Sequence, residues 1–334
     1  MYCGSVTTTR VTPDTRQRNS WPGGLWLVAC VLLALTSRAD AETLLRVPGS
    51  DLIGATAVAT ATQDDTLTDI GRRTGLGYEE MLRANPGIDP WVPGEGTEVV
   101  LPKRFILPAG AREGVIVNIA EYRLYYFTQA AGAPAVATFP VSIGRMDWST
   151  PLGRHRISSK QTRPAWYPPE SVRAEHAADG RPLPKVVPPG PDNPLGDYAM
   201  RLNISSYLIH GTNKPVGIGM QVTHGCIRMY PEDIQWLYPQ IPVGTSVQIV
   251  NQPVKFGWAA DGLYLEVHPA LEGDVSSLER GMTVVTEAYV EATRERPANV
   301  DWNLVEEVYR AKLGIPIRVG DAVAPAVGTT AATL

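Results

Sequence analysis

Short stretches of alternating apolar and polar residues, separated by glycine and proline, make up much of the chain. Alternation predicts β-strands, because successive side chains of a strand point to opposite faces of the sheet. In a few segments the apolar residues instead lie three or four positions apart, as Leu67 and Ile70 do, which predicts short helices. The chain is therefore expected to be mainly β, with minor helices.

Residues 1–41 are predicted to be a signal peptide. The apolar run from Leu25 to Leu35 follows a polar start with three arginines. It is too short to cross a bilayer, which takes about 20 residues. Ala39-Asp40-Ala41 then matches the small-x-small pattern at which such peptides are cleaved. The protein is expected to be exported; the alternative is a lipid anchor at Cys30.

Residues 57–102 are expected to form a small α+β domain. Two short helices lie between two strands, the second strand being Thr97–Leu101. Asp65-Thr66-Leu67 offers caps for the first helix, Gly75 ends it, and Asn85-Pro86-Gly87 ends the second. This order and these motifs resemble a LysM module, a family that binds N-acetylglucosamine-containing glycans such as peptidoglycan. A structural spacer is the alternative interpretation.

Residues 113–251 are expected to form a β-sandwich with minor helices. A helix is predicted from Pro231, since proline and acidic residues favour a helix N-terminus. From Lys160 to Ala199 the chain is proline-rich and is expected to form a long ordered loop, which in a compact domain usually serves function. The predicted strands are Val115–Ile119, Arg123–Phe127, Val136–Ile143, Arg154–Ser158, Tyr207–Ile209 and Val247–Val250.

Residues 252–334 are expected to be a partly helical C-terminal extension. A strand is predicted at Gly262–Val267, and helices at Ser276–Arg294 and Trp302–Leu313. The segment Ile315–Leu334 is rich in alanine, threonine, glycine and valine and is expected to be a frayed tail. No chemistry is evident in this extension.

Composition narrows the class of protein. The 334 residues are 44% hydrophobic and 19% charged, which favours a folded chain of about two domains over a disordered one. A net charge of −4 argues against nucleic-acid binding, which favours a basic face.

Two of the three cysteines, Cys3 and Cys30, leave with the predicted signal peptide. Cys226 then remains alone in an oxidising compartment, where it cannot form an internal disulfide.

Two segments carry the candidate chemistry, Ile209-His210-Gly211-Thr212 and Thr223-His224-Gly225-Cys226-Ile227-Arg228. A thiol needs a base or a positive field to become a nucleophilic thiolate near neutral pH, and two histidines supply that. Gly225 lets the backbone approach a substrate carbonyl, so that nearby N–H groups can form an oxyanion hole. Arg228 adds a positive charge suited to a carboxylate.

These residues resemble the active-site signature of the L,D-transpeptidases with a YkuD-type catalytic domain: His, a spacer, then Ser/Thr-His-Gly-Cys-hydrophobic-Arg/Asn. Thr150-Pro151-Leu152-Gly153 and the proline-rich stretch Arg163–Leu195 also resemble this family, particularly its periplasmic ErfK/YbiS-like group, in which a LysM module precedes the catalytic domain. The resemblance implies a nucleophile at Cys226, a general acid/base at His210, an oxyanion side lined by His224 and Gly225, and a donor-peptide contact at Arg228.

The resemblance implies a two-step acyl transfer that needs no cofactor, metal or nucleotide. The thiolate of Cys226 attacks the meso-diaminopimelate carbonyl of a tetrapeptide stem and expels the terminal D-alanine. His210 protonates the leaving amine and later deprotonates an acceptor amine. That acceptor is either a second stem, which gives a 3–3 crosslink, or a lysine of an outer-membrane lipoprotein. The expected partners are therefore peptidoglycan stems and glycan strands in the periplasm.

Other interpretations stay open on the residues alone. His210, His224 and Cys226 could be three zinc ligands with an open fourth position. A papain-like endopeptidase is disfavoured, because there the cysteine ordinarily precedes its histidine. If water is the acceptor, the protein is an L,D-carboxypeptidase. A further alternative is a non-catalytic protein that binds the cell wall through residues 57–102 alone. The remaining histidines, His155, His176 and His268, are expected to have surface or packing roles.

Overall fold

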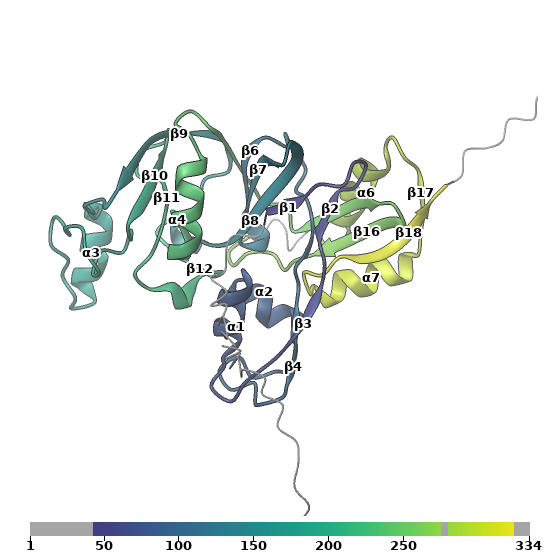
Figure 1. The fold of residues 1–334 in the computed structure, drawn as a ribbon, viewed down its shortest axis with the longest axis horizontal. Helices are drawn as coiled ribbons and strands as arrows, with labels where there is room; N and C mark the ends of the chain where they lie inside the picture. Colours follow the sequence, from purple (N-terminus) through teal and green to yellow (C-terminus); the bar gives the residue numbers. More distant parts are fainter. Residues whose placement is uncertain (1–42, 275–279, 324–334) are drawn as a thin grey trace, which may run out of the picture. The chain divides into compact units, whose positions relative to one another are not determined.

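Four β-sheets contain the strands in the part of the chain that the structure describes (Figure 1). The computed structural model describes residues 43–274 and 280–323, all of which belong to one compact unit. The predicted signal peptide, with Cys30, lies outside these residues. No helix within the described ranges is long and apolar enough to cross a membrane. The expectation of a mainly β protein is confirmed.

The largest sheet closes on itself. Its strand β8 (Ala133–Gly144) pairs with β7 (Arg123–Ala130) and, farther along, with β13 (Ile227–Met229). From β13 the pairing runs back to β7 through β11 (Leu208–His210), β10 (Tyr198–Leu202), β9 (Gly153–Thr162), β14 (Ser246–Val250) and β6 (Gly114–Asn118). β1 (Thr43–Leu45) and β12 (Gln221–Thr223) add to β8. The strands of the predicted sandwich thus form a continuous ring of hydrogen-bonded strands, because the long strand β8 has partners at both ends of the series.

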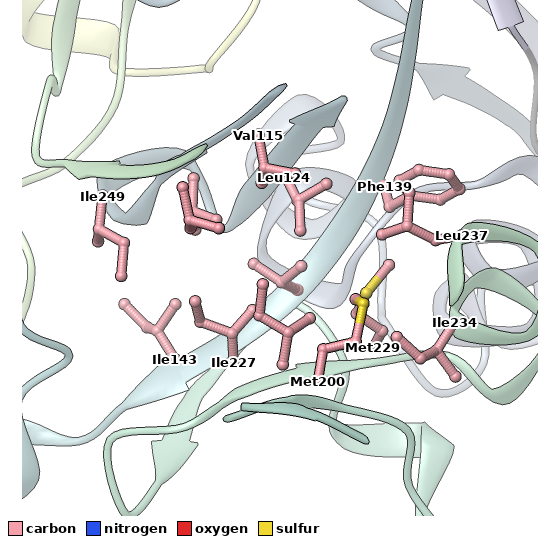
Figure 2. Packing of buried hydrophobic residues seen from close by; sticks show 14 of the residues in the cluster. Val115, Leu124, Phe139, Ile143, Met200, Ile227, Met229, Ile234, Leu237 and Ile249 are labelled. Carbon is pink, nitrogen blue, oxygen red and sulfur yellow. The ribbon is translucent and has the colours of Figure 1, made fainter. Parts of the chain in front are cut away.

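Aliphatic side chains from the strands of this ring fill a common core (Figure 2). Val115 and Val117 lie two residues apart on β6 and are both fully buried. Helix α4 (Pro231–Gln240) adds Ile234 and Leu237, and it begins at Pro231 as predicted. Burying each such side chain stabilises the fold by about 1.5–3 kcal/mol. Single-turn helices occur at η1 (Ile119–Glu121), η2 (Met146–Trp148) and η3 (Pro215–Gly217).

The proline-rich segment between β9 and β10 is ordered, as predicted, but it also contains a helix, α3 (Glu170–Ala178). The side chain of Asn193, which is fully buried, holds the segment together. Its Nδ2 donates to the carbonyl oxygen of Pro164 at 2.8 Å, and its Oδ1 accepts from the backbone N–H of Leu195 at 2.9 Å. These bonds fix both ends of the segment and so fix the position from which α3 projects.

The predicted order of strand, helix, helix, strand is confirmed between residues 57 and 102. The helices α1 (Leu67–Thr74) and α2 (Tyr78–Ala84) lie between the paired strands β3 (Ala57–Thr60) and β4 (Glu98–Leu101). Thr66 caps α1 through a reciprocal hydrogen bond with Asp69, and Gly75 ends it with a φ of 75°. A buried ion pair between Glu80 and Arg123 ties α2 to β7.

The C-terminal extension contains its own four-stranded sheet. The order is β15 (Val254–Ala259), β16 (Gly262–Val267), β18 (Ile317–Ala322), β17 (Ala298–Val300), and helices α6 (Met282–Thr293) and α7 (Trp302–Ala311) pack on it (Figure 1). The expected frayed tail is wrong for residues 317–322. The weak apolar pattern there forms β18 because β16 and β17 on either side satisfy its backbone and Val319 is buried. A further pair, β2 (Leu52–Gly54) with β5 (Arg104–Ile106), completes the strands.

Candidate active site

The two motif segments lie on neighbouring parallel strands. His210 at the end of β11 is in register with Arg228 on β13. Continuing this register places Cys226 beside Leu208, two residues before His210. Residues two apart on a strand share one face of the sheet, and residues in register on parallel strands do as well. Cys226, His210 and Arg228 therefore face the same side, although eighteen sequence positions separate the last two.

The imidazole of His210 has a defined tautomer. Its Nδ1 lies 2.6 Å from the carbonyl oxygen of Gly211. A carbonyl oxygen only accepts hydrogen bonds, so Nδ1 carries the proton and Nε2 presents a lone pair. Burial lowers the pKa of His210 to about 4, with the nearby charge of Arg228 acting in the same direction. At neutral pH the ring is therefore uncharged and able to accept a proton at Nε2.

Cys226 is also uncharged at rest. Its thiol donates a hydrogen bond to the carbonyl oxygen of Ser206 across 3.6 Å. Burial raises the pKa of the Cys226 thiol, and the backbone of Leu208 and the charge of Arg201 oppose this only in part. The thiol and the imidazole are thus both neutral at rest. A neutral thiol yields a thiolate when its proton moves to a neighbouring base.

Two threonine hydroxyls fix the turn before Cys226. Gly225 has a φ of 94°, and a Cβ at this position would lie 2.7 Å from Cε1 of Tyr207, so glycine is required both for its backbone angle and for space. Thr150 donates to the carbonyl oxygen of Gly225 at 3.0 Å and accepts from the N–H of Gly144 at 2.9 Å. Thr223 donates to the carbonyl oxygen of Cys226 at 2.6 Å. The peptide planes on both sides of the thiol are therefore held in place.

His224 joins the motif to helix α3. Its Nε2 lies 2.9 Å from Oε2 of Glu175, whose Oε1 accepts from Arg145 at 2.5 Å. Trp148 packs edge-on against the imidazole, with 5.2 Å between ring centroids. Hydrogen bonds from Arg145 and His224 lower the pKa of Glu175, which keeps it ionised. Glu175 thus anchors the α3 segment beside the turn that precedes Cys226, a link that sequence reasoning missed.

Arg228 offers a positive charge on the same face as the thiol. Its guanidinium is partly buried, which lowers its pKa, and its Nε has no hydrogen-bond partner among the described residues. Burying a charged group without a partner is costly, so the site favours an anion that can pair with it. A carboxylate on the substrate is a ligand of that kind.

The ligand atoms of His210, His224 and Cys226 do not converge as a zinc site would require. Within the ranges the structure describes, one group of potential metal ligands lies close enough to share an ion: Glu121, Glu266 and His268. The ammonium of Lys255 already occupies that position, 2.7 Å from Oε2 of Glu121 and 2.8 Å from Oε1 of Glu266. The group is a buried salt-bridge cluster that joins the C-terminal sheet to the catalytic region. The geometry thus favours a thiol nucleophile over a zinc centre.

Comparisons with known proteins agree with this geometry. A family model described as the L,D-transpeptidase catalytic domain, YkuD, matches residues 112–249. The probable L,D-transpeptidase ErfK/SrfK of Salmonella typhimurium is 40% identical over 276 residues, which cover 81% of this chain and 88% of the relative. The probable L,D-transpeptidase YbiS of Escherichia coli is 37% identical over 302 residues, with 88% and 97% covered. YcfS of Escherichia coli, also named a probable L,D-transpeptidase, is 35% identical over 305 residues, with 90% and 94% covered. The similarity therefore extends well beyond the catalytic region.

Proposed function

The chain belongs to the L,D-transpeptidases with a YkuD catalytic domain, and on that premise we propose that it transfers peptidoglycan stem peptides through a thioester on Cys226. The observation that carries the proposal is a neutral thiol and a neutral imidazole, the latter protonated on Nδ1, on the same face of the sheet. Nucleophile and base lie on one face of adjacent strands. The reaction needs no group beyond these side chains and the substrates.

The first half-reaction forms the thioester. The thiol proton of Cys226 moves to Nε2 of His210, and the sulfur attacks the meso-diaminopimelate carbonyl of the tetrapeptide stem. The resulting oxyanion is assigned to the side of the turn formed by His224 and Gly225, where the threonine bonds hold the peptide planes. As the C–N bond breaks, His210 returns the proton to the departing amine, and D-alanine leaves. Arg228 pairs with a carboxylate of the donor stem.

The second half-reaction breaks the thioester. An acceptor amine gives its proton to Nε2 of His210 as its nitrogen attacks the thioester carbonyl. A new amide bond forms, the C–S bond breaks, and the sulfur recovers a proton from His210. With the amine of a second stem as acceptor, the product is a 3–3 crosslink; with a lipoprotein lysine, it is a protein attached to the wall. Peptidoglycan stems are thus the proposed donor and one of the two proposed acceptors.

We also propose that residues 57–102 are a LysM-like module that binds glycan and holds the enzyme on its polymer. The strand–helix–helix–strand order supports this assignment. Trp91 is 54% exposed, and its ring centroid lies 6.2 Å from that of Tyr78, so an aromatic surface is available for a sugar ring. The periplasm is the proposed location, because the substrate lies there and the first 41 residues match a signal peptide.

The test is a product analysis with the mature protein and purified disaccharide-tetrapeptide, alongside Cys226→Ala. We expect release of D-alanine and a 3–3 dimer from the wild type and neither from the variant. Tripeptide without dimer would show hydrolysis of the thioester and would overturn crosslinking between stems. Equal amounts of product from both proteins would show that Cys226 is not the nucleophile. Circular dichroism of the variant establishes that it folds.

A further inference from the structure

A pocket of about 360 Å³, lined by residues outside the Cys226 motif, contains three arginines. Arg46 precedes β2, Arg112 precedes β6, and Arg296 lies between α6 and β17, so three separate parts of the chain meet there. Trp258 of β15 and Asp51 complete the polar and aromatic lining. None of these residues belongs to the motif that contains Cys226, so the pocket is separate from the candidate active site.

One carboxylate neutralises only one of the three charges. Asp51 accepts from Arg112 at 2.5 Å through Oδ1 and from the backbone N–H of Trp258 at 2.8 Å through Oδ2. Both of its oxygens are therefore engaged. Across the described residues, Arg46 and Arg296 have no carboxylate within ion-pair distance. The pocket thus holds two positive charges that the protein does not pair.

Aromatic rings contact both unpaired arginines, although Arg296 is exposed and Arg46 is half-buried. The guanidinium of Arg296 stacks over the Trp258 ring, 3.9 Å from its centroid. That of Arg46 lies 6.0 Å from the ring centroid of Phe127, and its Nε is buried without a hydrogen-bond partner. Burial and the neighbouring charge of Arg112 lower the pKa of Arg46. Two arginines without a carboxylate partner that line one pocket favour an anion there.

We propose that this pocket binds the phosphate group of a small phosphate ester. A phosphate dianion balances the two unpaired guanidiniums, and its oxygens match the paired N–H groups that an arginine presents. The volume exceeds that of one phosphate, which leaves room for a glycerol- or sugar-sized group beside the Trp258 wall. Free phosphate esters and the headgroups of phospholipids share this chemistry. The bound group would link the segment at Arg46 to the catalytic region and the C-terminal sheet.

The test uses the mature chain with glycerol 3-phosphate and with inorganic phosphate, at constant ionic strength set by sodium chloride. The variants are Arg46→Gln and Arg296→Gln, and the matched control is Arg154→Gln, an exposed arginine of β9 outside the pocket. We expect a saturable rise in Tm and a calorimetric binding signal for the wild type and the control. Each pocket variant should weaken binding at least tenfold.

A second arm separates the two sources of the phosphate. Vesicles of phosphatidylglycerol in phosphatidylcholine are sedimented with each protein, with and without glycerol 3-phosphate. Retention on vesicles that the soluble ester displaces identifies a lipid headgroup, and binding of the ester alone identifies a free phosphate ester. Retained transpeptidase activity shows that the variants fold. The proposal is overturned if no probe binds the wild type, or if the pocket variants and Arg154→Gln respond alike.

Discussion

The Nδ1 atom of His210 lies 2.6 Å from the carbonyl oxygen of Gly211, the next residue of the chain. Because that oxygen only accepts, the bond fixes the proton on Nδ1 and leaves Nε2 as the proposed base. A backbone carbonyl here orients the imidazole as a carboxylate does in many hydrolases. Unlike a carboxylate, the carbonyl adds no negative charge beside the buried ring, which is consistent with the low pKa of His210.

The first prediction concerns the pH dependence of the reaction. Below about pH 4 the imidazole of His210 is protonated and cannot take the thiol proton. We therefore expect the acid limb of kcat/KM to lie near pH 4, well below the value of about 6.5 for an ordinary histidine. Initial rates of D-alanine release between pH 3.5 and 8 measure it. A limb near pH 6.5 would show that His210 is not held in its buried, neutral form.

The second prediction concerns the base itself. His210→Gln removes the proton acceptor but keeps a side chain that can donate to the carbonyl of Gly211. General-base catalysis is worth roughly 10²–10⁴-fold, so kcat should fall by about that factor while the melting temperature changes little. Steady-state kinetics with thermal melts check both quantities. A loss below tenfold would mean that another group takes the thiol proton.

The third prediction concerns the link from α3 to the motif. Glu175→Ala releases both His224 and Arg145, so the α3 segment loses its anchor beside the catalytic turn. We expect KM for the tetrapeptide to rise about tenfold. Glu170→Ala is the matched control, because Glu170 is an exposed acid on the same helix. If Glu175→Ala and Glu170→Ala have the same KM, Glu175 does not anchor the α3 segment for substrate binding.

The fourth prediction concerns the turn that carries the thiol. Thr150→Val leaves the N–H of Gly144 and the carbonyl oxygen of Gly225 without their common partner. An unsatisfied buried polar group costs about 1–3 kcal/mol, so the free energy of unfolding should fall by at least that amount and kcat with it. Thr150→Ser keeps the hydroxyl and should restore both. Urea denaturation gives the stability, and a Thr150→Val protein as stable and as active as the wild type would contradict the role of the hydroxyl.

The fifth prediction is one of stability against pH. Burial raises the pKa of Asp233 to about 8, and its Oδ2 has no hydrogen-bond partner within the described chain. Between pH 3.8 and 8 the folded state holds this proton and the unfolded state does not, so this residue's contribution to stability falls as the pH rises. Asp233→Asn should therefore stabilise the protein more at pH 9 than at pH 5, by roughly 4 kcal/mol, since about three pH units of the titration lie between them. Denaturation at both pH values tests it, and an equal effect would refute it.

Local signals explain what the sequence could predict. Capping by Thr66, the stop at Gly75 and the proline start of α4 depend on a few neighbouring residues, and each is found as expected. The motif around Cys226 and His210 is also short and specific. These features need no knowledge of how distant parts of the chain meet.

What the sequence could not predict depends on distant partners. Forty-nine positions separate Glu175 from His224, and seventy-five separate Thr150 from Gly225, so no local pattern pairs them. The closure of the main sheet depends on β8 pairing at both ends, which alternation along one strand cannot reveal. The strand at residues 317–322 has a weak pattern and forms only because neighbouring strands accept it.

The central claim is that Cys226 carries the acyl group as a thioester, and the mass of the intact protein during turnover tests it most directly. The mature enzyme is mixed with tetrapeptide stem, quenched in acid within seconds, and digested to locate the adduct. We predict an added mass equal to the stem without its terminal D-alanine, on the peptide that contains Cys226, and its absence in Cys226→Ala. An adduct on another residue, or product formation with no adduct at any time, would contradict the mechanism.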